Sequence, residues 1–260
     1  MIRRNPLVAF TLITFLLSWT FWLPQVLFSQ GYITVQNPLW GFGSFGPSIA
    51  GVTVIAIVSG KKGLKALWSR LLNWKIKLTW YAFVFIFPPL VIVIAFLIHR
   101  LSGGAIPLLI TTESLFLIIP TFFLVLMLGG PLNEELGWRG FMLPQLLKSA
   151  SSLHAALIVG VIWAVWHLPL FWISGASQEG IPVGAVLLQI IALSFIFTWL
   201  HNRTGGSLLI PLFFHAALNT SGAILPVLPA QAGSLQPYLI TVILAVLFAL
   251  FLAIMTKGKL

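Results

Sequence analysis

Long apolar stretches alternate with short polar segments along almost the whole chain. A helix needs ~20 apolar residues to cross a hydrocarbon core about 30 Å thick, and eight stretches approach this length. They cover residues 7–28, 42–59, 80–99, 107–129, 153–173, 182–201, 207–225 and 237–256. The pattern predicts an all-α, polytopic membrane bundle of about eight transmembrane helices, in which residues 1–260 form a single integral membrane domain.

The sequence Gly129-Gly130-Pro131 interrupts the end of the fourth stretch. Proline is tolerated in the first turn of a helix, so a second, shorter helix can begin here. We predict it over residues 131–148, with two glutamates in its first turn. One continuous, kinked fourth helix is an equal alternative.

Composition supports a membrane protein. The chain is 59% hydrophobic and 7% charged, with a mean hydropathy of +1.06, whereas soluble domains carry about 25% charged residues. No stretch is polar enough for a separate soluble domain. Cysteine is absent, which excludes disulfides and thiolate metal sites.

The net charge of +10 reflects membrane topology and not nucleic-acid binding, which needs a basic face on a folded soluble surface. Eight spans place both termini and the even-numbered loops on one side, with 13 Lys and Arg residues against Arg100 alone on the other. The 13 are Arg3, Arg4, Lys61, Lys62, Lys65, Arg70, Lys75, Lys77, Arg139, Lys148, Arg203, Lys257 and Lys259. The positive-inside rule therefore predicts cytoplasmic termini. We expect a multi-pass protein of a prokaryotic plasma membrane.

Residues 61–77 alternate cations with leucines and tryptophans. This alternation is typical of a helix that lies on the membrane surface with its cations at anionic headgroups. Membrane lipid is therefore an expected partner.

Glu134 and Glu135 lie inside this apolar chain, and ionisable groups at membrane depth are costly and usually functional. Neighbours on a helix point about 100° apart, so the two cannot face one small site equally. Glu135 and Arg139 are spaced i, i+4, which predicts an ion pair. Glu134 is then the freer carboxylate and a candidate base for water. A purely structural salt-bridge cluster is the alternative.

Three further polar residues fall within predicted spans. His167 lies in the fifth, and His215 and Asn219 share one face of the seventh at i, i+4. His215 and Asn219 can hold a developing oxyanion, or all three can form hydrogen bonds between helices. Because such groups usually face the bundle interior and meet each other, we expect them to gather with Glu134.

These groups supply the parts needed to activate water and to stabilise a tetrahedral intermediate. The chain has no G-x-S-x-G motif. Glu134, His167 and His215 also match the ligand types of a catalytic divalent metal such as zinc. However, no H-E-x-x-H motif is present, and the spacing leaves a metal open.

The three segments resemble the CAAX protease and bacteriocin-processing family, also called CPBP or Abi, which includes the type II CAAX prenyl endopeptidase. The family pattern is E-E-x-x-x-R, then F-x-x-x-H, then H-x-x-x-N or H-x-x-x-D. This chain reads Glu134-Glu135-Leu-Gly-Trp-Arg139, Trp163-Ala-Val-Trp-His167 and His215-Ala-Ala-Leu-Asn219. The resemblance covers about residues 125–222, the predicted catalytic core. Trp163 replaces the usual phenylalanine, an exchange that we expect to alter shape more than chemistry.

The resemblance implies an eight-helix fold with an intramembrane site open toward the cytoplasm. It assigns activation of water to Glu134 and His167, oxyanion stabilisation to His215 and Asn219, and orientation of the site to Glu135 and Arg139. Family members have been regarded as glutamate-type and as metallo-peptidases. Some are linked to bacteriocin immunity or maturation, so a prenylated substrate does not follow.

The sequence thus favours an intramembrane endopeptidase acting on a membrane-associated protein or peptide. A non-catalytic immunity or peptide-binding protein is the first alternative, and an ion-coupled transporter is the second. Oligomeric state and substrate are not set by these patterns.

Overall fold

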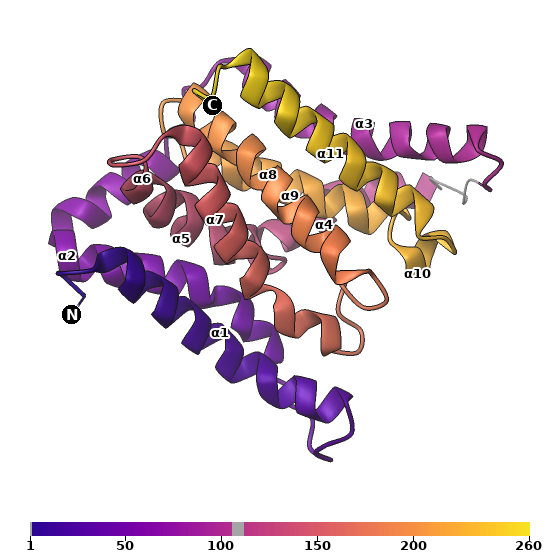
Figure 1. Ribbon diagram of the computed structural model, residues 1–260, viewed down its shortest axis with the longest axis horizontal. Coiled ribbons are helices and arrows are strands. Elements are labelled where there is room, and N and C mark those ends of the chain that lie inside the picture. Colours follow the sequence, from indigo (N-terminus) through magenta and orange to yellow (C-terminus); the bar gives the residue numbers. More distant parts are fainter. Residues whose placement is uncertain (1, 106–111) are drawn as a thin grey trace.

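The protein is a bundle of helices, described by a computed structural model over residues 2–105 and 112–260, with the backbone alone for 112–115. The described residues form helices and no strand, which confirms the predicted all-α class (Figure 1). The elements are α1 (Pro6–Ser29), η1 (Trp40–Phe45), α2 (Gly46–Leu71), α3 (Leu78–Leu101), α4 (Thr112–Leu128), α5 (Pro131–Gly137), η2 (Trp138–Met142), α6 (Leu143–Leu146), α7 (Ser152–Trp166), η3 (Leu168–Trp172), α8 (Val183–Arg203), α9 (Leu209–Ile224), α10 (Pro229–Ala232) and α11 (Gln236–Met255).

The predicted spans correspond to these helices within a few residues, except that α2 continues to Leu71 beyond the predicted end at residue 59. Positions 107–111 of the fourth predicted span lie outside the described residues. Seven helices of the described chain are long and apolar enough to cross a membrane, and the bent pair Phe116–Leu128 and Pro131–Leu146 makes an eighth. Proline stands in the first turn of α1, α2, α5 and α11, where its missing N–H breaks no helical hydrogen bond. Ser151 caps α7 by accepting from the backbone N–H of His154.

The fourth span is broken and not merely kinked. Its two parts meet at 44°, and Gly130 between them has φ +112°, a conformation that favours glycine. The shorter helix predicted over 131–148 is present as α5, the π-helix η2 and α6. The continuous alternative is therefore wrong, because the backbone leaves the helical region at Gly130.

The surface helix predicted over residues 61–77 is shorter than expected. Residues 61–71 continue α2 beyond a bend at Gly60, which has φ +58°. Residues 73–77 are not helical. The structure contains no membrane, so the predicted contact with lipid headgroups stays a prediction.

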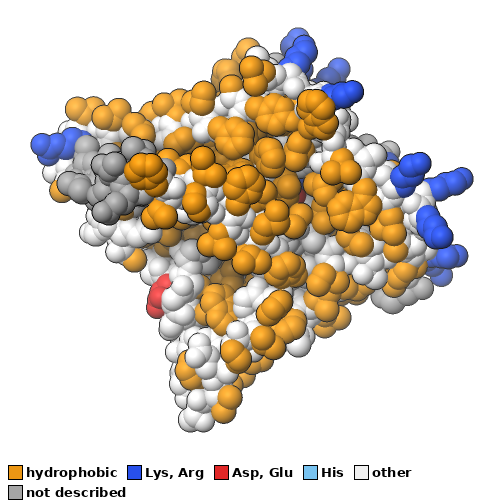
Figure 2. All heavy atoms as spheres, turned by 180° about the vertical axis from the view of Figure 1, so that it is seen from behind, with side chains coloured by type: hydrophobic (Ala, Val, Ile, Leu, Met, Phe, Trp, Pro, Cys, Tyr) orange, Lys and Arg blue, Asp and Glu red, His pale blue; other side chains and the backbone are white. Residues whose placement is uncertain are grey.

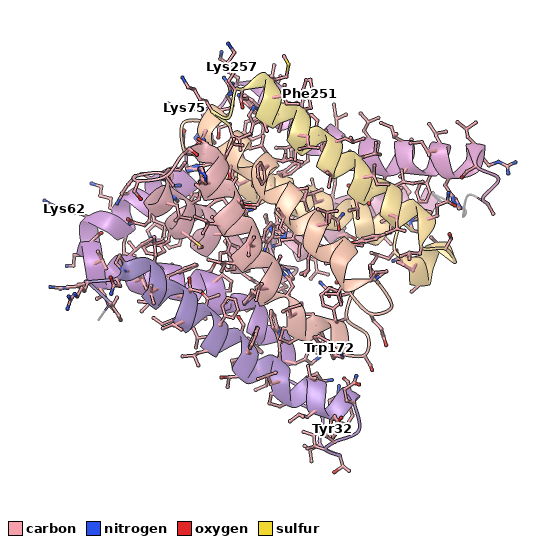
Figure 3. The ribbon with its side chains drawn as sticks, in the orientation of Figure 1. Tyr32, Lys62, Lys75, Trp172, Phe251 and Lys257 are labelled. Atoms are coloured by element: carbon pink, nitrogen blue, oxygen red, sulfur yellow. The ribbon has the colours of Figure 1, made fainter. Side chains whose placement is uncertain are left out.

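Both termini lie at one end of the bundle, here called the basic end. Arg3 Nε donates to the Ile57 carbonyl, and Asn202 Nδ2 donates to the carbonyl of Leu260. Of the 14 Lys and Arg residues, Arg139 is buried inside the bundle and Arg100 lies at the other end of α3, while the other twelve belong to the basic end. Lys62, Lys75 and Lys257 mark this end in Figure 3.

The other end, here called the opposite end, contains the loops after α1, α3, η3 and α9. Gln30 Nε2 donates to the Trp172 carbonyl there, and His99 Nδ1 lies 3.0 Å from Gln236 Oε1. Tyr32 and Trp172 mark this end in Figure 3. Which end faces the cytoplasm stays a prediction from the charge distribution.

The outside of the bundle suits lipid, because large apolar side chains such as Leu16, Ile86 and Leu250 are more than half exposed. Hydrophobic side chains cover most of the face in Figure 2, and cationic side chains stand at its margins. The interior is rich in aromatic residues and contains buried polar groups from α5, η2 and α9. These inward polar groups gather near the middle of the bundle and form the site.

Candidate active site

The site begins where the fourth span breaks. A helix end leaves backbone carbonyls without helical partners. The Leu128 carbonyl accepts from Asn133 Nδ2 (3.1 Å), and the Gly129 carbonyl accepts from Asn219 Nδ2 (2.9 Å). Because unsatisfied backbone groups are costly in lipid, these bonds stabilise the break. They also place the Asn219 side chain of α9 beside the start of α5.

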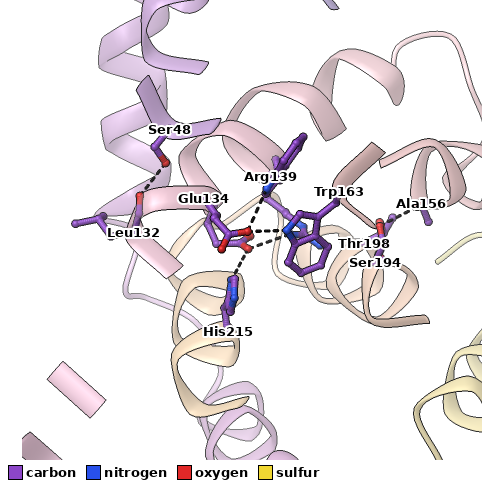
Figure 4. Close-up of polar contacts among 11 residues, drawn as sticks. Ser48, Leu132, Glu134, Arg139, Ala156, Trp163, Ser194, Thr198 and His215 are labelled. Carbon is purple, nitrogen blue, oxygen red and sulfur yellow. Dashed lines mark hydrogen bonds and ion pairs between the residues drawn. The ribbon is translucent and has the colours of Figure 1, made fainter. Parts of the chain in front are cut away.

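Glu134 lies in the first turn of α5 and is 5% exposed. Its Oε2 accepts from Trp163 Nε1 at 2.6 Å and from Trp138 Nε1 at 3.3 Å. Trp163 comes from α7 (Figure 4). Trp138 comes from the turn that follows Glu134 in the same span. Two indole donors therefore fix one carboxylate oxygen and leave Oε1 directed toward Gly130.

Glu135 is fully buried, and one of its carboxylate oxygens accepts hydrogen bonds from two side chains. Its Oε1 lies 2.9 Å from Arg139 Nη1, which confirms the predicted i, i+4 ion pair. The same oxygen lies 2.9 Å from His215 Nδ1 of α9. A carboxylate only accepts, so His215 Nδ1 carries the proton and Nε2 is directed away from Glu135. The expected orienting role of Glu135 thus runs through His215.

Arg139 is buried in the site and does not stand at the membrane surface. The sequence count that placed it among the loop cations is wrong for this residue, because Arg139 lies in η2 and is 0% exposed. Its guanidinium carbon lies 4.3 Å from the centre of the Trp163 ring and 4.0 Å from that of Phe197. Ring faces attract cations, so the two aromatic residues and Glu135 hold this charge.

Three polar atoms from two helices surround one small space beside Gly130. A Cβ atom on Gly130 would lie 2.9 Å from Glu134 Oε1, 3.5 Å from Asn219 Nδ2 and 3.6 Å from His215 Nε2. These are hydrogen-bonding distances or slightly longer. The absence of a side chain at Gly130 leaves this space free.

His167 lies within the span Ser152–Trp172, as predicted, at the point where α7 ends and η3 begins. Its Nδ1 lies 2.8 Å from the Trp163 carbonyl, and a carbonyl only accepts. Nδ1 therefore carries a proton, and in the neutral ring Nε2 is an acceptor. The ring packs 4.7 Å from that of Trp166 and lines the same cavity as Glu134.

A cavity of about 690 Å³ joins these residues. Glu134, His167, His215 and Asn219 line it together, and the remaining wall is mostly apolar. It extends toward the opposite end, where Trp40 lines it. Cytoplasmic termini and a site open to the cytoplasm, both expected above, are therefore incompatible, because both termini lie at the basic end.

The donor types fit a zinc ion, since Glu134 Oε1 and the Nε2 atoms of His167 and His215 are the atoms not engaged elsewhere. Their positions do not fit one ion. Among the described residues, no three His, Asp or Glu side chains form a group that could hold a metal. Metal dependence therefore stays a prediction, and the chemistry below uses no metal.

The sequence reasoning missed both tryptophan donors. Trp138 is spaced i, i+4 from Glu134, and this spacing places them on one helix face. Trp163 offered no such signal, and the expectation that it would differ from phenylalanine mainly in shape is wrong. Its indole N–H makes a 2.6 Å bond that phenylalanine cannot make.

Comparisons with known proteins cover the part of the chain that contains these residues. The family profile described as Type II CAAX prenyl endopeptidase Rce1-like matches residues 114–221, a range that includes all six predicted site residues. The protein CAAX prenyl protease 2 of the archaeon Methanococcus maripaludis is 27% identical over 237 residues, which cover 86% of both chains. Its archaeal origin supports a prokaryotic source. These matches show that the chain is similar to the Rce1-like CAAX proteases, and they indicate a membrane-embedded endopeptidase.

Proposed function

We propose that this endopeptidase hydrolyses a peptide bond of a membrane-associated protein or peptide with a water molecule activated by Glu134 and His167. The observation that carries the proposal is the meeting of Glu134 Oε1, Asn219 Nδ2 and His215 Nε2 around the space beside Gly130. This space can hold a water molecule or the oxygen of a substrate carbonyl.

Glu134 Oε1 accepts a proton from water while the water oxygen attacks the carbonyl carbon. The indole donors on Oε2 keep the carboxylate in place during this transfer. The Nε2 atom of His167 serves as a second acceptor for the water. General bases of this kind contribute about 10²- to 10⁴-fold to a rate.

The tetrahedral intermediate carries a negative oxygen. Asn219 has two amide N–H groups, of which one donates to the Gly129 carbonyl and the other is available for this oxygen. His215 donates through Nε2 when its ring carries both protons. Glu135 orients His215 through the contact between its Oε1 and His215 Nδ1, and Arg139 orients Glu135 through the ion pair with the same oxygen.

Glu134 then returns the proton to the amide nitrogen of the substrate. The C–N bond breaks, and the products are a new carboxyl terminus and a new amino terminus. The mostly apolar wall of the cavity suits an extended, apolar peptide segment. The relative's name specifies prenylated substrates, but nothing in the wall requires a prenyl group.

Protein termini in membranes give a direct test. Cells would carry wild type, Glu134→Gln or the control Glu179→Gln at equal expression. Glu179 is exposed, is not a lining residue of the cavity and accepts from the backbone N–H of Gly175 in the loop after η3, so its variant makes the same chemical change away from Glu134. New termini should appear with wild type and Glu179→Gln and be absent with Glu134→Gln. The same termini with a folded, inserted Glu134→Gln protein would overturn the proposal and favour a binding role.

A further inference from the structure

The wall of the large cavity along α8 and α11 contains polar side chains that the proposed reaction does not use. The two helices pack side by side (Figure 1), and the Tyr238 hydroxyl of α11 donates to Gln189 Oε1 of α8 at 2.5 Å. Gln189, Tyr238 and Thr241 all line the cavity and are here called the polar patch. The other cavity residues of these two helices are apolar, and they are Val186, Ile190, Leu193, Ile196 and Ala245.

Gln189 faces the cavity. The α8 residues that line the cavity follow one face of the helix, and they are Val186, Gln189, Ile190, Leu193 and Ile196. Leu188, which points away from this face, is 49% exposed on the outside of the bundle. The polar patch is therefore part of the cavity wall and not of the surface that suits lipid.

The Gln189 amide has donors to spare. A glutamine side chain has one carbonyl oxygen and two N–H donors. Tyr238 occupies the oxygen, and within residues 2–105 and 112–260 the Gln189 N–H groups have no acceptor. A pair that only joined two helices would leave these donors unpaired in an apolar wall, which is costly. Thr241 Oγ1 donates to the Tyr238 carbonyl and keeps its lone pairs as acceptors.

The charges of the wall favour an uncharged ligand at the polar patch. The described residues that line the cavity include no Lys, Arg or Asp, and the Glu among them is Glu134. A charged substrate side chain at the polar patch would have no partner in the wall, and a buried charge without a partner is costly. Hydroxyl and amide side chains, which donate and accept without charge, match the free groups of Gln189 and Thr241.

The distance from the polar patch to the site follows from positions along α8. The Phe197 ring lies 5.7 Å from the rings of Trp163 and His215, so Phe197 marks the level of the site. Gln189 precedes Phe197 by eight residues in the same helix, which corresponds to ~12 Å along the helix axis. An extended peptide advances about 3.3 Å per residue, so it covers this distance in about three or four residues.

We infer that the polar patch is a specificity subsite for an uncharged polar side chain of the substrate, about three or four residues from the scissile bond. The Gln189 N–H groups donate to the oxygen of this side chain, and Thr241 Oγ1 accepts from its O–H or N–H. The preferred substrate is thus an apolar segment with one Ser, Thr, Asn or Gln at this distance. The inference deepens the proposed function and rests on it, because it takes the scissile bond to lie beside Glu134.

The sequences around cleavage sites test this subsite. Protein termini would be mapped in membranes from cells with wild type, Gln189→Leu or the control Gln145→Leu at equal expression. Leucine is similar to glutamine in size and lacks the amide. Gln145 accepts from Lys148 Nζ and does not line the large cavity. Wild type and the control should give termini enriched in Ser, Thr, Asn or Gln about three or four residues to one side of the cut, and Gln189→Leu should lose this enrichment.

Two peptides measure the preference. One is a substrate from the mapped termini with its polar residue, and the other has leucine at that position. Wild type should cleave the polar peptide with a kcat/KM about five- to 100-fold higher, because the leucine peptide leaves the polar patch unpaired. Gln189→Leu should slow the polar peptide and cleave the leucine peptide at least as fast as wild type. A variant that is merely less stable would slow both peptides equally.

The outcomes separate this subsite from the proposed function. An unchanged cleavage-site profile for Gln189→Leu, or equal kcat/KM values of wild type for the two peptides, would overturn the subsite and leave the peptidase activity standing. Termini that persist with Glu134→Gln and still depend on Gln189 would contradict the proposed base and leave the subsite standing. No cleavage by wild type would overturn the proposed function and the subsite with it.

Discussion

The two halves of the bundle differ in the surroundings of their polar side chains. In the half toward the basic end, Arg139 and Glu135 are fully buried and form an ion pair, and the Arg139 guanidinium also lies over the Trp163 and Phe197 rings. In the half toward the opposite end, Glu134 Oε1 and His167 border a cavity of about 690 Å³. In the proposed function, the closed half holds the supporting residues, and the cavity of the open half is the space for the reaction.

The adjacent glutamates show what this difference teaches. A helix turns about 100° per residue, which directs Glu135 to the closed half and Glu134 to the open half. Glu135 is bound by Arg139 and His215, whereas Glu134 has one oxygen bound and one oxygen near the space beside Gly130. We therefore expect mutations to separate activity from stability along this boundary.

The largest effect is expected from Glu134→Gln. Loss of the proposed base should reduce kcat/KM by about 10²- to 10⁴-fold. The melting temperature in detergent should remain that of wild type, because the amide oxygen can still accept from Trp163. Cleavage of a peptide identified by termini mapping and a thermal melt measure the two quantities. A Glu134→Gln protein with a lowered melting temperature as well as a lowered kcat/KM would contradict the expected separation of activity from stability between the two halves.

Glu135→Gln should mainly lower the stability of the protein. It leaves the buried Arg139 charge without its carboxylate, and breaking a buried pair from one side costs about 3–5 kcal/mol. Thermal melts should show a large decrease in melting temperature. The double variant Glu135→Gln/Arg139→Met removes both charges and should recover part of the loss. A wild-type melting temperature for Glu135→Gln would contradict the supporting role of the closed half.

Trp163→Phe tests the hydrogen bond from Trp163 Nε1 to Glu134 Oε2, which connects the closed half to the open half. A hydrogen bond to a charged group contributes about 1.5–3 kcal/mol, so kcat should fall about ten- to 100-fold. KM should change by less than about twofold, because the indole acts through Glu134 and not on the substrate. Trp138→Phe should cost less, since its bond is 3.3 Å long instead of 2.6 Å.

Trp166→Phe is the matched control for this series. Its indole donates to Ser18 Oγ at 2.7 Å in the same buried layer and does not bond Glu134. Equal decreases in kcat for Trp163→Phe and Trp166→Phe would show that the effect comes from packing and not from the Glu134 contact.

The smallest effect is expected from metal removal. Among the described residues, Glu134, His167 and His215 do not form a group that could hold a metal ion. Dialysis against a strong chelator should therefore change the rate of cleavage by less than about twofold. A zinc enzyme would instead lose its metal ion and its activity. The assay compares dialysed protein with and without added zinc. Inactivation by the chelator and recovery with zinc would show that the side chains rearrange around a metal.

Much of the fold follows from hydropathy, because lipid requires ~20 apolar residues per span. The helices α1, α3 and α8 begin and end within a few residues of their predicted limits. The break of the fourth span was open, since Gly129-Gly130-Pro131 permits both a kink and a break. Packing settles it, because Asn219 satisfies the freed Gly129 carbonyl.

The candidate site was predictable in its residues and not in its connections. Spacing along one helix predicted the Glu135–Arg139 pair, and the same rule would have revealed Trp138 beside Glu134. The contacts of Glu134 with Trp163 and of Glu135 with His215 join residues 29 and 80 positions apart. No local spacing encodes such contacts, nor the direction in which the cavity opens.

The broken fourth span also sets the order in which a newly made chain matures. Glu135 and the Gly129 carbonyl enter the membrane 80 and 90 residues before their partners His215 and Asn219. At about 5–20 residues per second, translation separates them by roughly 4–18 seconds. During that interval Glu135 lacks its contact with His215, and the Gly129 carbonyl lacks the Asn219 donor. Under the proposed function, activity arises only after α9, in the last quarter of the chain, has been inserted.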